Sequence, residues 1–267
     1  VGELEPELLG LLEAGGQHTA AAIAAQLGYP EAGIAEYLAA LVHAGLVERN
    51  GDTGGVEAFQ ALPAFTQMLH AVGYVSWTLN ANRPFVEHAP AFFRSAAEAR
   101  KVHHRDGHQI AITSQWMGAE DFYPAARDAI FALAPRRFVD LGAGSARLLI
   151  DVLLRFPGAT GVALDLSAGA CAAARENAER AGVLSRLTIV ERSIQSVADD
   201  PSILDGADAI HGGFVFHDML PEEESTCDRV LGACASVLAE TGGTMLVTDA
   251  APYVEDPRER MFGAAVT

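Results

Sequence analysis

The stretch that decides the fold is FVDLGAGSA, residues 138–146. Its first four residues, three of them apolar, are typical of a buried strand that ends in a turn holding Gly142 and Gly144. A helical pattern follows from Arg147 to Phe156. Glycine at the carboxyl end of a strand lets a ligand approach the backbone, and the amino terminus of the next helix offers it free amide groups. The stretch therefore predicts a strand, a ligand-binding turn and a helix.

Further apolar runs lie at regular intervals after this turn, separated by helical patterns. The expected strands are residues 138–141, 161–165, 187–190, 207–216 and 244–249. Strands that alternate with helices are typical of a parallel sheet covered by helices on both faces. The fold class predicted for this part of the chain is therefore α/β.

An acidic residue, Asp165, ends the second expected strand, 23 positions after Gly142. A carboxylate at this place can accept hydrogen bonds from both ribose hydroxyls of a nucleoside. Two ligands compete for such a site, a dinucleotide and S-adenosylmethionine. The dinucleotide fingerprint needs a third glycine where this chain has Arg147, and Asp140 suits a cationic ligand better than a pyrophosphate. The residues favour S-adenosylmethionine, while a structural role for Asp140, capping amides of the loop, stays open.

Residues 1–60 combine short helices with a strand pair. Thr19 can cap a helix from Ala20 to Leu27, and a third helix runs from about Glu31 to Ala44. Residues 46–49 and 56–59 then read as a β-hairpin, which completes a winged-helix pattern. The expected recognition helix has Glu31, Glu36 and His43 but no Arg or Lys, and DNA-binding helices need cations there. We therefore expect a role in dimerisation or substrate closure rather than in DNA binding.

Residues 61–130 are expected to be mainly helical, with their aromatic side chains in the core or between domains. Four of the nine histidines lie between residues 88 and 108, at His88, His103, His104 and His108. A pair of them could bind a metal, but exposed histidines without that role are commoner.

Composition excludes several classes of protein. The 267 residues are 50% hydrophobic and carry a formal net charge of −17, which disfavours binding to nucleic acid or to an anionic membrane. No apolar run is long enough to span a membrane, and no basic segment precedes an apolar one at the start. The three cysteines are too few and too scattered for a disulfide framework or a cysteine zinc site. We expect a cytoplasmic protein.

The stretch from Val139 to Ala146 resembles motif I of the class I S-adenosylmethionine-dependent methyltransferases. Together with the winged-helix start, the chain is similar to the plant O-methyltransferase-like group, which bacteria use in natural-product pathways. The resemblance implies a Rossmann-like sheet whose turn residues, Gly142 and Gly144, contact the methionine part of the cofactor. It further assigns cofactor contacts to Asp140, Asp165, Leu166, Ser193, Ile194 and Tyr123, with Asp165 at the ribose and the pair Ser193 and Ile194 at the adenine.

The segment FHDM, residues 216–219, follows the fourth expected strand. It resembles the His-Asp-Trp segment of the O-methyltransferases, in which the histidine removes the proton of the acceptor hydroxyl. His217 falls on that histidine, and an imidazole titrates near neutrality. Met219 stands where that family has Trp.

A narrower resemblance is to the metal-dependent C-methyltransferases that act on 2-oxo acids or in polyketide loading. It rests on residues 104–107, residues 122–125 and the pair His217-Asp218. It implies that His217 and Asp218 are catalytic and ligate a mononuclear metal (iron, manganese or zinc) together with a later histidine. A metal bound by a 2-oxo acid or malonyl group would stabilise the enolate whose carbon is methylated. No histidine follows His217 in this sequence.

Three further assignments have structural alternatives. Asp218 could cap a helix over residues 222–238. His211, inside the fourth expected strand, could replace the later histidine as a metal ligand or be a buried and hydrogen-bonded histidine. Asp249 could face the substrate or cap a loop.

We therefore expect a winged-helix-like domain over residues 1–100 and a Rossmann-like methyltransferase domain over residues 101–267 that is incomplete at its carboxyl end. The first functional hypothesis is metal-assisted C-methylation of a 2-oxo acid or of a malonyl-type group on a carrier protein. O-methylation of a phenolic or hydroxylated metabolite with His217 as base is the alternative. A non-catalytic regulator that binds the cofactor is the third. The expected partners are a small-molecule or carrier-bound acyl substrate, and either a second copy of the chain or a larger assembly-line protein.

Overall fold

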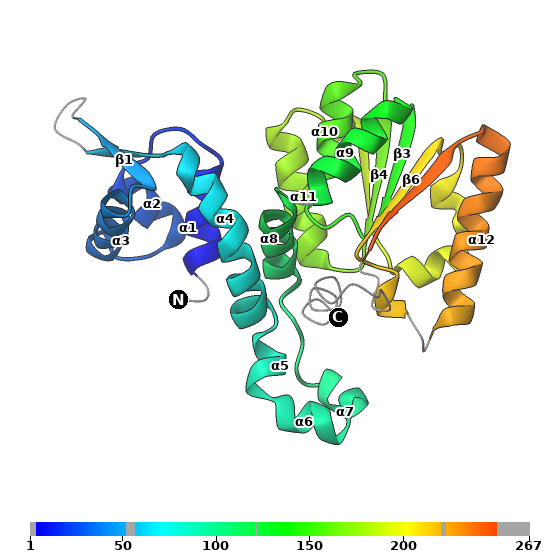
Figure 1. Ribbon diagram of the computed structural model, residues 1–267, viewed down its shortest axis with the longest axis horizontal. Helices are drawn as coiled ribbons and strands as arrows, with labels where there is room; N and C mark the ends of the chain where they lie inside the picture. Colours follow the sequence, from blue (N-terminus) through cyan, green and yellow to red (C-terminus); the bar gives the residue numbers. More distant parts are fainter. Residues whose placement is uncertain (1–3, 52–56, 121, 220–222, 250–267) are drawn as a thin grey trace. The chain divides into compact units, whose positions relative to one another are not determined.

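The computed structural model of the chain describes residues 4–51, 57–120, 122–219 and 223–249 (Figure 1). It divides into two compact units, Val1–Glu120 and Asp121–Thr267. The division lies twenty residues later than the boundary expected near residue 100. The reason is helix α8 (Gly107–Gly118), which packs on helix α4 (Pro63–Ser76) within the first unit. Gly73 permits this close packing, because a Cβ atom there would lie 2.8 Å from the backbone nitrogen of Met117.

The first unit begins with the expected helix–turn–helix and hairpin. Its elements are α1 (Leu4–Glu13), α2 (Ala20–Leu27), α3 (Glu31–His43), β1 (Val47–Asn50) and β2 (Ala58–Ala61). The Thr19 hydroxyl accepts a hydrogen bond from the amide of Ala22, and Gly28 ends α2 in the left-handed conformation, both as expected. Strands β1 and β2 pair antiparallel, Val47 opposite Ala61. Val56, expected to open the second strand, and Asp52 in the turn lie outside the described residues.

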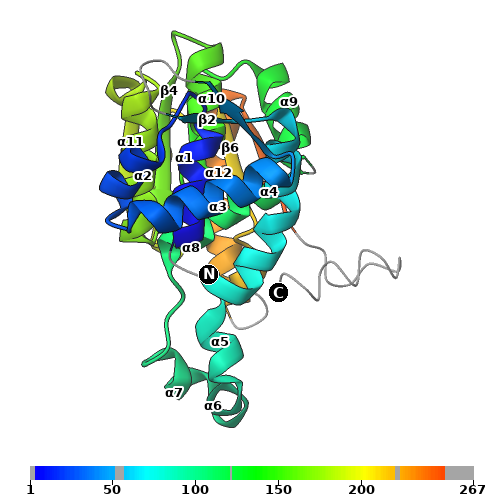
Figure 2. The same cartoon turned by 90° about the vertical axis from the view of Figure 1, so that its left-hand side faces the viewer.

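Short helices complete the first unit and confirm its helical character. After α4 come a π-helical turn (Trp77–Ala81), α5 (Arg83–Glu87), α6 (Ala89–Arg94), α7 (Ala96–Arg100) and α8. Helices α1 to α3 lie at one end of α4, and α5 to α7 at the other (Figures 1 and 2). One apolar core runs through the helix–turn–helix and includes Trp116 of α8, whose indole N–H donates to Glu13 at 2.8 Å.

The second unit is the expected parallel sheet with helices on both faces. Its main elements are α9 (Phe122–Leu133), β3 (Arg137–Leu141), α10 (Arg147–Arg155), β4 (Thr160–Asp165), α11 (Ala168–Arg180), β5 (Leu187–Glu191), β6 (Ala209–Gly213), α12 (Glu224–Thr241) and β7 (Thr244–Thr248). Short 3₁₀ turns occupy Leu184–Arg186, Ile194–Ala198, Pro201–Leu204 and His217–Met219. The strand order is β5-β4-β3-β6-β7, and all neighbours are parallel.

Alternate residues of each strand feed two separate cores. Phe138 of β3 packs with residues of α9, α10 and α11, whereas its neighbour Val139 packs with residues of α12. Helices α9 to α11 and helix α12 accordingly lie on opposite faces of the sheet (Figure 1). The chain moves outward in opposite directions from β3 and β6, and a ligand of such a sheet binds at the carboxyl ends of the strands where this reversal occurs. The fold class predicted from the sequence is confirmed.

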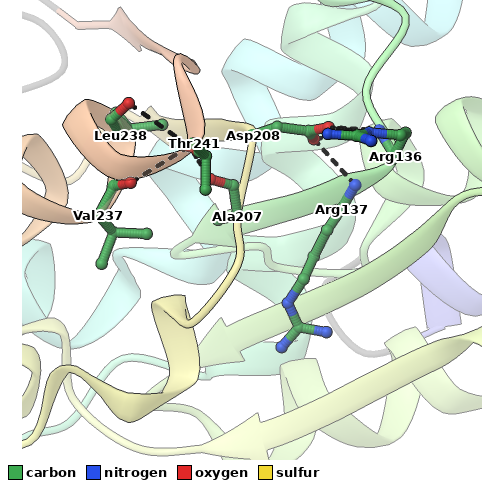
Figure 3. Close-up of polar contacts among 7 residues, drawn as sticks. All are labelled: Arg136, Arg137, Ala207, Asp208, Val237, Leu238 and Thr241. Atoms are coloured by element: carbon green, nitrogen blue, oxygen red, sulfur yellow. Dashed lines mark hydrogen bonds and ion pairs between the residues drawn. The ribbon is translucent and has the colours of Figure 1, made fainter.

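Asp208 fastens the other edge of the sheet, at the amino ends of the strands (Figure 3). Its carboxylate accepts hydrogen bonds from the backbone amides of Arg136 and Arg137 at 2.9–3.0 Å, just before and at the start of β3. The Arg136 guanidinium lies 3.2 Å from the same carboxylate but is 86% exposed.

We expect Asp208→Ala to lower the free energy of unfolding by about 1–3 kcal/mol, because two backbone amides lose their acceptor. Arg136→Ala is the matched control and should cost at most about 1 kcal/mol, since an exposed ion pair contributes little. Chemical denaturation of both variants measures the difference. Equal losses would show that the ion pair, not the amide bonds, holds this edge.

None of the described helices is long and apolar enough to cross a membrane. The three cysteines, Cys171, Cys227 and Cys234, are buried and form no disulfide. Burial raises the pKa of all three thiols, that of Cys234 to about 11.

Candidate active site

The glycine turn follows β3 directly and is fastened to the neighbouring strand. The amides of Gly142 and Ala143 donate to the carbonyl of Leu164 in β4 at 2.8 and 3.0 Å. Gly142 has φ = +74°, and a Cβ atom on it would lie 2.2 Å from Cγ1 of Val215 and 3.6 Å from Cδ1 of Ile194. The turn therefore needs glycine at residue 142 both for its backbone angle and for space.

Gly142→Ala should lower the free energy of unfolding by about 2–4 kcal/mol, because the left-handed angle and the collision with Val215 add up. Gly158→Ala is the matched control, since nothing lies within 4 Å of that added atom and the backbone there is ordinary. Thermal unfolding compares the two. Similar behaviour of both variants would show that the turn relaxes without cost.

Asp165 closes the glycine turn from the end of β4. One carboxylate oxygen accepts the amide of Gly144 at 2.9 Å, and the other accepts the amide of Ser167 at 2.9 Å. Burial raises the pKa of Asp165, although the two amide bonds oppose the shift. Leu166, next in the chain, is 72% exposed and presents an apolar side chain beside this carboxylate. Asp165 thus lies at the carboxyl end of β4, bonded to the glycine turn.

The residues expected around the adenine come from the end of β5. Ser193 precedes the 3₁₀ turn Ile194–Ala198, and Ile194 lies close to Gly142. This places Ile194 at the same edge of the sheet as the glycine turn. Nothing in the described structure contacts the Ser193 side chain in a way that assigns it a role.

Tyr123 of α9 is held against the helix that starts at the glycine turn. Its hydroxyl donates to Asp151 of α10 at 2.5 Å, and the Arg147 guanidinium lies 5.2 Å from the ring centre. Burial, together with the bond to Asp151, raises the pKa of this phenol, so the hydroxyl stays protonated.

A histidine–aspartate pair lies past the end of β6. Nδ1 of His217 is 2.5 Å from Oδ1 of Asp249, the residue that follows β7. The other oxygen of Asp249 accepts the backbone amides of Phe216 and His217 at 3.0 and 3.3 Å. Both side chains are largely buried. A carboxylate bound to Nδ1 leaves Nε2 as the basic nitrogen, which is the arrangement of a general base.

Two comparisons identify the domain that holds this site. Residues 139–244 match the family model of a methyltransferase domain, and residues 7–51 match that of the IclR helix–turn–helix domain.

Residues 139–244 are thus similar to a methyltransferase domain, and the second unit has the Rossmann-like fold of the class I S-adenosylmethionine-dependent methyltransferases.

Individual relatives agree with this assignment. A 3-hydroxy-5-methyl-1-naphthoate 3-O-methyltransferase of Streptomyces sahachiroi is 29% identical over 131 residues, 49% of this chain. The match spans only about a third (35%) of that relative's own length. Two solved structures share the fold over 98% of this methyltransferase. They are an O-methyltransferase family protein from Burkholderia thailandensis (21% identity, 80% of that chain, TM-score 0.51) and human N-acetylserotonin methyltransferase in complex with S-adenosylmethionine (16%, 79%, 0.56).

Two aromatic side chains lie near His217. Phe214 has φ = +54°, a left-handed conformation that is uncommon for a bulky residue. Its ring centre lies 4.4 Å from that of Phe122 and 6.5 Å from that of His217. Strained backbone angles concentrate at functional sites, and this one places an aromatic ring near His217.

The metal site expected from the narrower resemblance finds no support. Nε2 of His217 and Oδ1 of Asp218 lie 3.6 Å apart, but Asp218 is 63% exposed. Within the described ranges, no group of three histidine, cysteine or acidic side chains is placed to hold a metal ion. His88 and His103 stack face to face, with ring centres 3.8 Å apart, and this parallel arrangement does not direct their nitrogens at one ion.

Asp218 does not cap the following helix either. Helix α12 begins at Glu224, later than expected, with Glu223 at its N-cap and no capping bond from a side chain. Residue 222, expected in its first turn, lies outside the described residues.

Asp140 lies deeper than a ligand contact requires. It is 4% exposed and bonds to His211, which is buried and hydrogen-bonded as its structural interpretation predicted. The described structure thus shows Asp140 paired with a side chain and not with the amides of the loop.

The partnership of Asp249 with His217 was missed at the sequence level, where Asp249 had only a substrate-facing or a loop-capping role. The sequence did hold a signal for this pair, because an acidic residue at the end of one strand can bond to a histidine at the end of the neighbouring strand. Strand order was needed to recognise that β6 and β7 are neighbours.

Proposed function

We propose that this methyltransferase moves a methyl group from S-adenosylmethionine to a hydroxyl oxygen of a small aromatic metabolite. The observation that carries the proposal is the His217–Asp249 pair, 2.5 Å apart, at the sheet edge that also holds the glycine turn. The two parts adjoin, since Val215, two residues before His217, fills the space over Gly142.

The residues at the glycine turn fit the cofactor. We assign contacts with its methionine part to Gly142 and Gly144, the ribose to Asp165, and the nucleoside surroundings to Leu166, Ser193 and Ile194. The partly buried carboxylate of Asp165 and its bond to the amide of Gly144 in the turn support this placement. Tyr123 supports the turn indirectly, through its bond to Asp151 in α10. Asp140 does so from β3, two residues before Gly142. When bound, S-adenosylmethionine supplies an electrophilic methyl group on a sulfonium sulfur.

His217 acts as the general base in this proposal. Asp249 holds the Nδ1 proton, so Nε2 takes the proton of the acceptor hydroxyl as its oxygen attacks the methyl carbon. The carbon–sulfur bond breaks as the carbon–oxygen bond forms, and the proton stays on the imidazole, stabilised by Asp249. Buried surroundings keep Asp249 in place and strengthen this interaction.

An aromatic acceptor is supported by the rings of Phe122 and Phe214 near the base. The Streptomyces relative, named for O-methylation of a hydroxynaphthoate, agrees with this class of substrate. Metal-assisted C-methylation, the first hypothesis from the sequence, needs three convergent ligands, and the described residues do not bring three together. We therefore place O-methylation first.

The first unit is proposed to act in dimerisation or substrate closure. The exposed side of α3 presents Glu31, Glu36 and His43, and the helix contains no Arg or Lys. This surface would repel a phosphate backbone.

The experiment incubates the purified protein with S-adenosylmethionine and a panel of hydroxynaphthoic acids and simple phenols. Mass spectrometry detects methylated products, and NMR of the product locates the new methyl group. We expect a methoxy product whose yield is insensitive to a chelator. A methyl group on carbon, or a chelator-sensitive yield, would return the C-methylation hypothesis to first place.

A further inference from the structure

Three polar side chains form a hydrogen-bonded series across three neighbouring strands of the sheet. Nδ1 of His211 in β6 lies 2.8 Å from Oδ1 of Asp140 in β3, and its Nε2 lies 3.1 Å from the hydroxyl of Thr248 in β7. Asp140 and His211 are only 4% and 6% exposed. They are opposite each other in the parallel register, and Thr248 is opposite Gly213. All three therefore project from the same face of the sheet.

The sequence makes room for this imidazole. A Cβ atom on Gly213 would lie 2.8 Å from Cε1 of His211, so a larger residue there would displace the ring. Both ring nitrogens are hydrogen-bonded, Nδ1 to the carboxylate of Asp140 and Nε2 to the hydroxyl of Thr248. A buried carboxylate without a partner is strongly unfavourable, so the bond to His211 compensates for the burial of Asp140.

The two ends of this hydrogen-bonded series, Asp140 and Thr248, adjoin the two halves of the candidate active site. Asp140 precedes Gly142 by two residues, in the strand that runs into the glycine turn. Thr248 is followed directly by Asp249, which bonds to His217. The carbonyl of Thr248 also accepts the amide of Phe214 at 2.7 Å.

We propose that His211 is a positioning residue that holds the cofactor turn and the His217–Asp249 pair in one fixed register. The inference rests on the proposed function, because it assumes that the turn binds S-adenosylmethionine and that His217 is the base. Methyl transfer requires the donor and the acceptor to be aligned, and a rigid link between their two supports maintains that alignment. His211 acts through Asp140 and Thr248 and has no contact with a substrate in this proposal.

The test breaks the hydrogen-bonded series of Asp140, His211 and Thr248 at two places by substitution. It measures the effect at both ends of the series. Calorimetry measures the affinity for S-adenosylmethionine, and NMR of protein labelled in histidine follows the Nδ1 proton of His217, whose signal is assigned by its loss in His217→Gln. Thr248→Val leaves the Asp140–His211 pair intact. Thr244→Val, at the exposed beginning of the same strand, is the matched control.

The two substitutions, Thr248→Val and His211→Leu, have different expected results. Thr248→Val should broaden the His217 proton signal through faster exchange with water and leave the affinity for S-adenosylmethionine unchanged. His211→Leu should broaden the signal and also weaken that affinity about ten-fold or more, the usual size of coupling between sites. His211→Gln, which can still reach both partners, should restore most of both. Thr244→Val should change neither.

A merely structural role would give another pattern. If Thr248→Val lowers only the melting temperature and leaves the His217 signal sharp, the inference is overturned even when His211→Leu does not fold. If the unaltered protein fails to bind S-adenosylmethionine, the proposed function fails and this inference with it. Binding with an unresponsive His217 signal would overturn the inference alone.

Discussion

Replacing His217 by glutamine is expected to lower the rate constant for methyl transfer about 100- to 10,000-fold, the usual contribution of a general base. Glutamine keeps the size and polarity of the side chain but cannot accept the hydroxyl proton. The affinity for S-adenosylmethionine should stay the same, because the assigned cofactor contacts lie on the glycine turn, Asp165 and the end of β5. Turnover assays with a saturating acceptor, together with calorimetry, measure the two quantities separately.

Two further variants sharpen this result. Asp249→Asn should also reduce the rate constant strongly, because the amide group no longer holds the proton of Nδ1 and the imidazole loses its orientation. His18→Gln is the control, since the His18 side chain lies in the first unit and bonds to the nearby carbonyl of Gly15. Normal turnover in His217→Gln would contradict the catalytic role of the pair, for either oxygen or carbon as the acceptor.

The second large effect concerns the cofactor. Asp165→Ala should weaken binding of S-adenosylmethionine by about 1–3 kcal/mol, the range for losing charge-assisted hydrogen bonds. The variant also frees the amides of Gly144 and Ser167, which the carboxylate holds in the native turn. Calorimetric titration measures the loss, and Glu179→Ala on the exposed side of α11 is the control.

Acid should weaken cofactor binding through the same residue. Burial raises the pKa of Asp165, so the carboxylate takes up a proton at a higher pH than an exposed aspartate does. The affinity for S-adenosylmethionine should therefore fall as the pH drops through this raised pKa, and Asp165→Asn should remove that part of the pH dependence. An affinity that is unchanged in Asp165→Ala would show that the ribose site lies elsewhere.

Local sequence patterns were sufficient to predict most of the sheet. The expected strand 138–141 is observed as Arg137–Leu141, and 187–190 as Leu187–Glu191. The fourth strand is shorter than expected, because Gly213 ends the pairing and Phe214 turns into the left-handed conformation. Apolar periodicity continues through residue 216 and cannot register such a change of backbone angle.

Side-chain partnerships across strands were harder to foresee. The bond between His211 and Asp140 joins residues 71 positions apart, and the bond between His217 and Asp249 joins residues 32 apart. Each depends on strand order and register, which a single sequence does not provide. The adjacent residues His217 and Asp218 suggested a pair of metal ligands in the sequence. In the structure, Nδ1 of His217 bonds to Asp249, and Asp218 is exposed.

The buried cysteines make this methyltransferase a convenient protein for site-directed spectroscopy. Thiol reagents attack the thiolate, and burial both shields the three native sulfurs and keeps them protonated near neutral pH. A cysteine introduced on an exposed helix face, such as that of α3 or α11, would therefore react selectively without removal of the natural thiols. Fluorescent or spin labels placed in this way can report on each unit separately in the otherwise native chain.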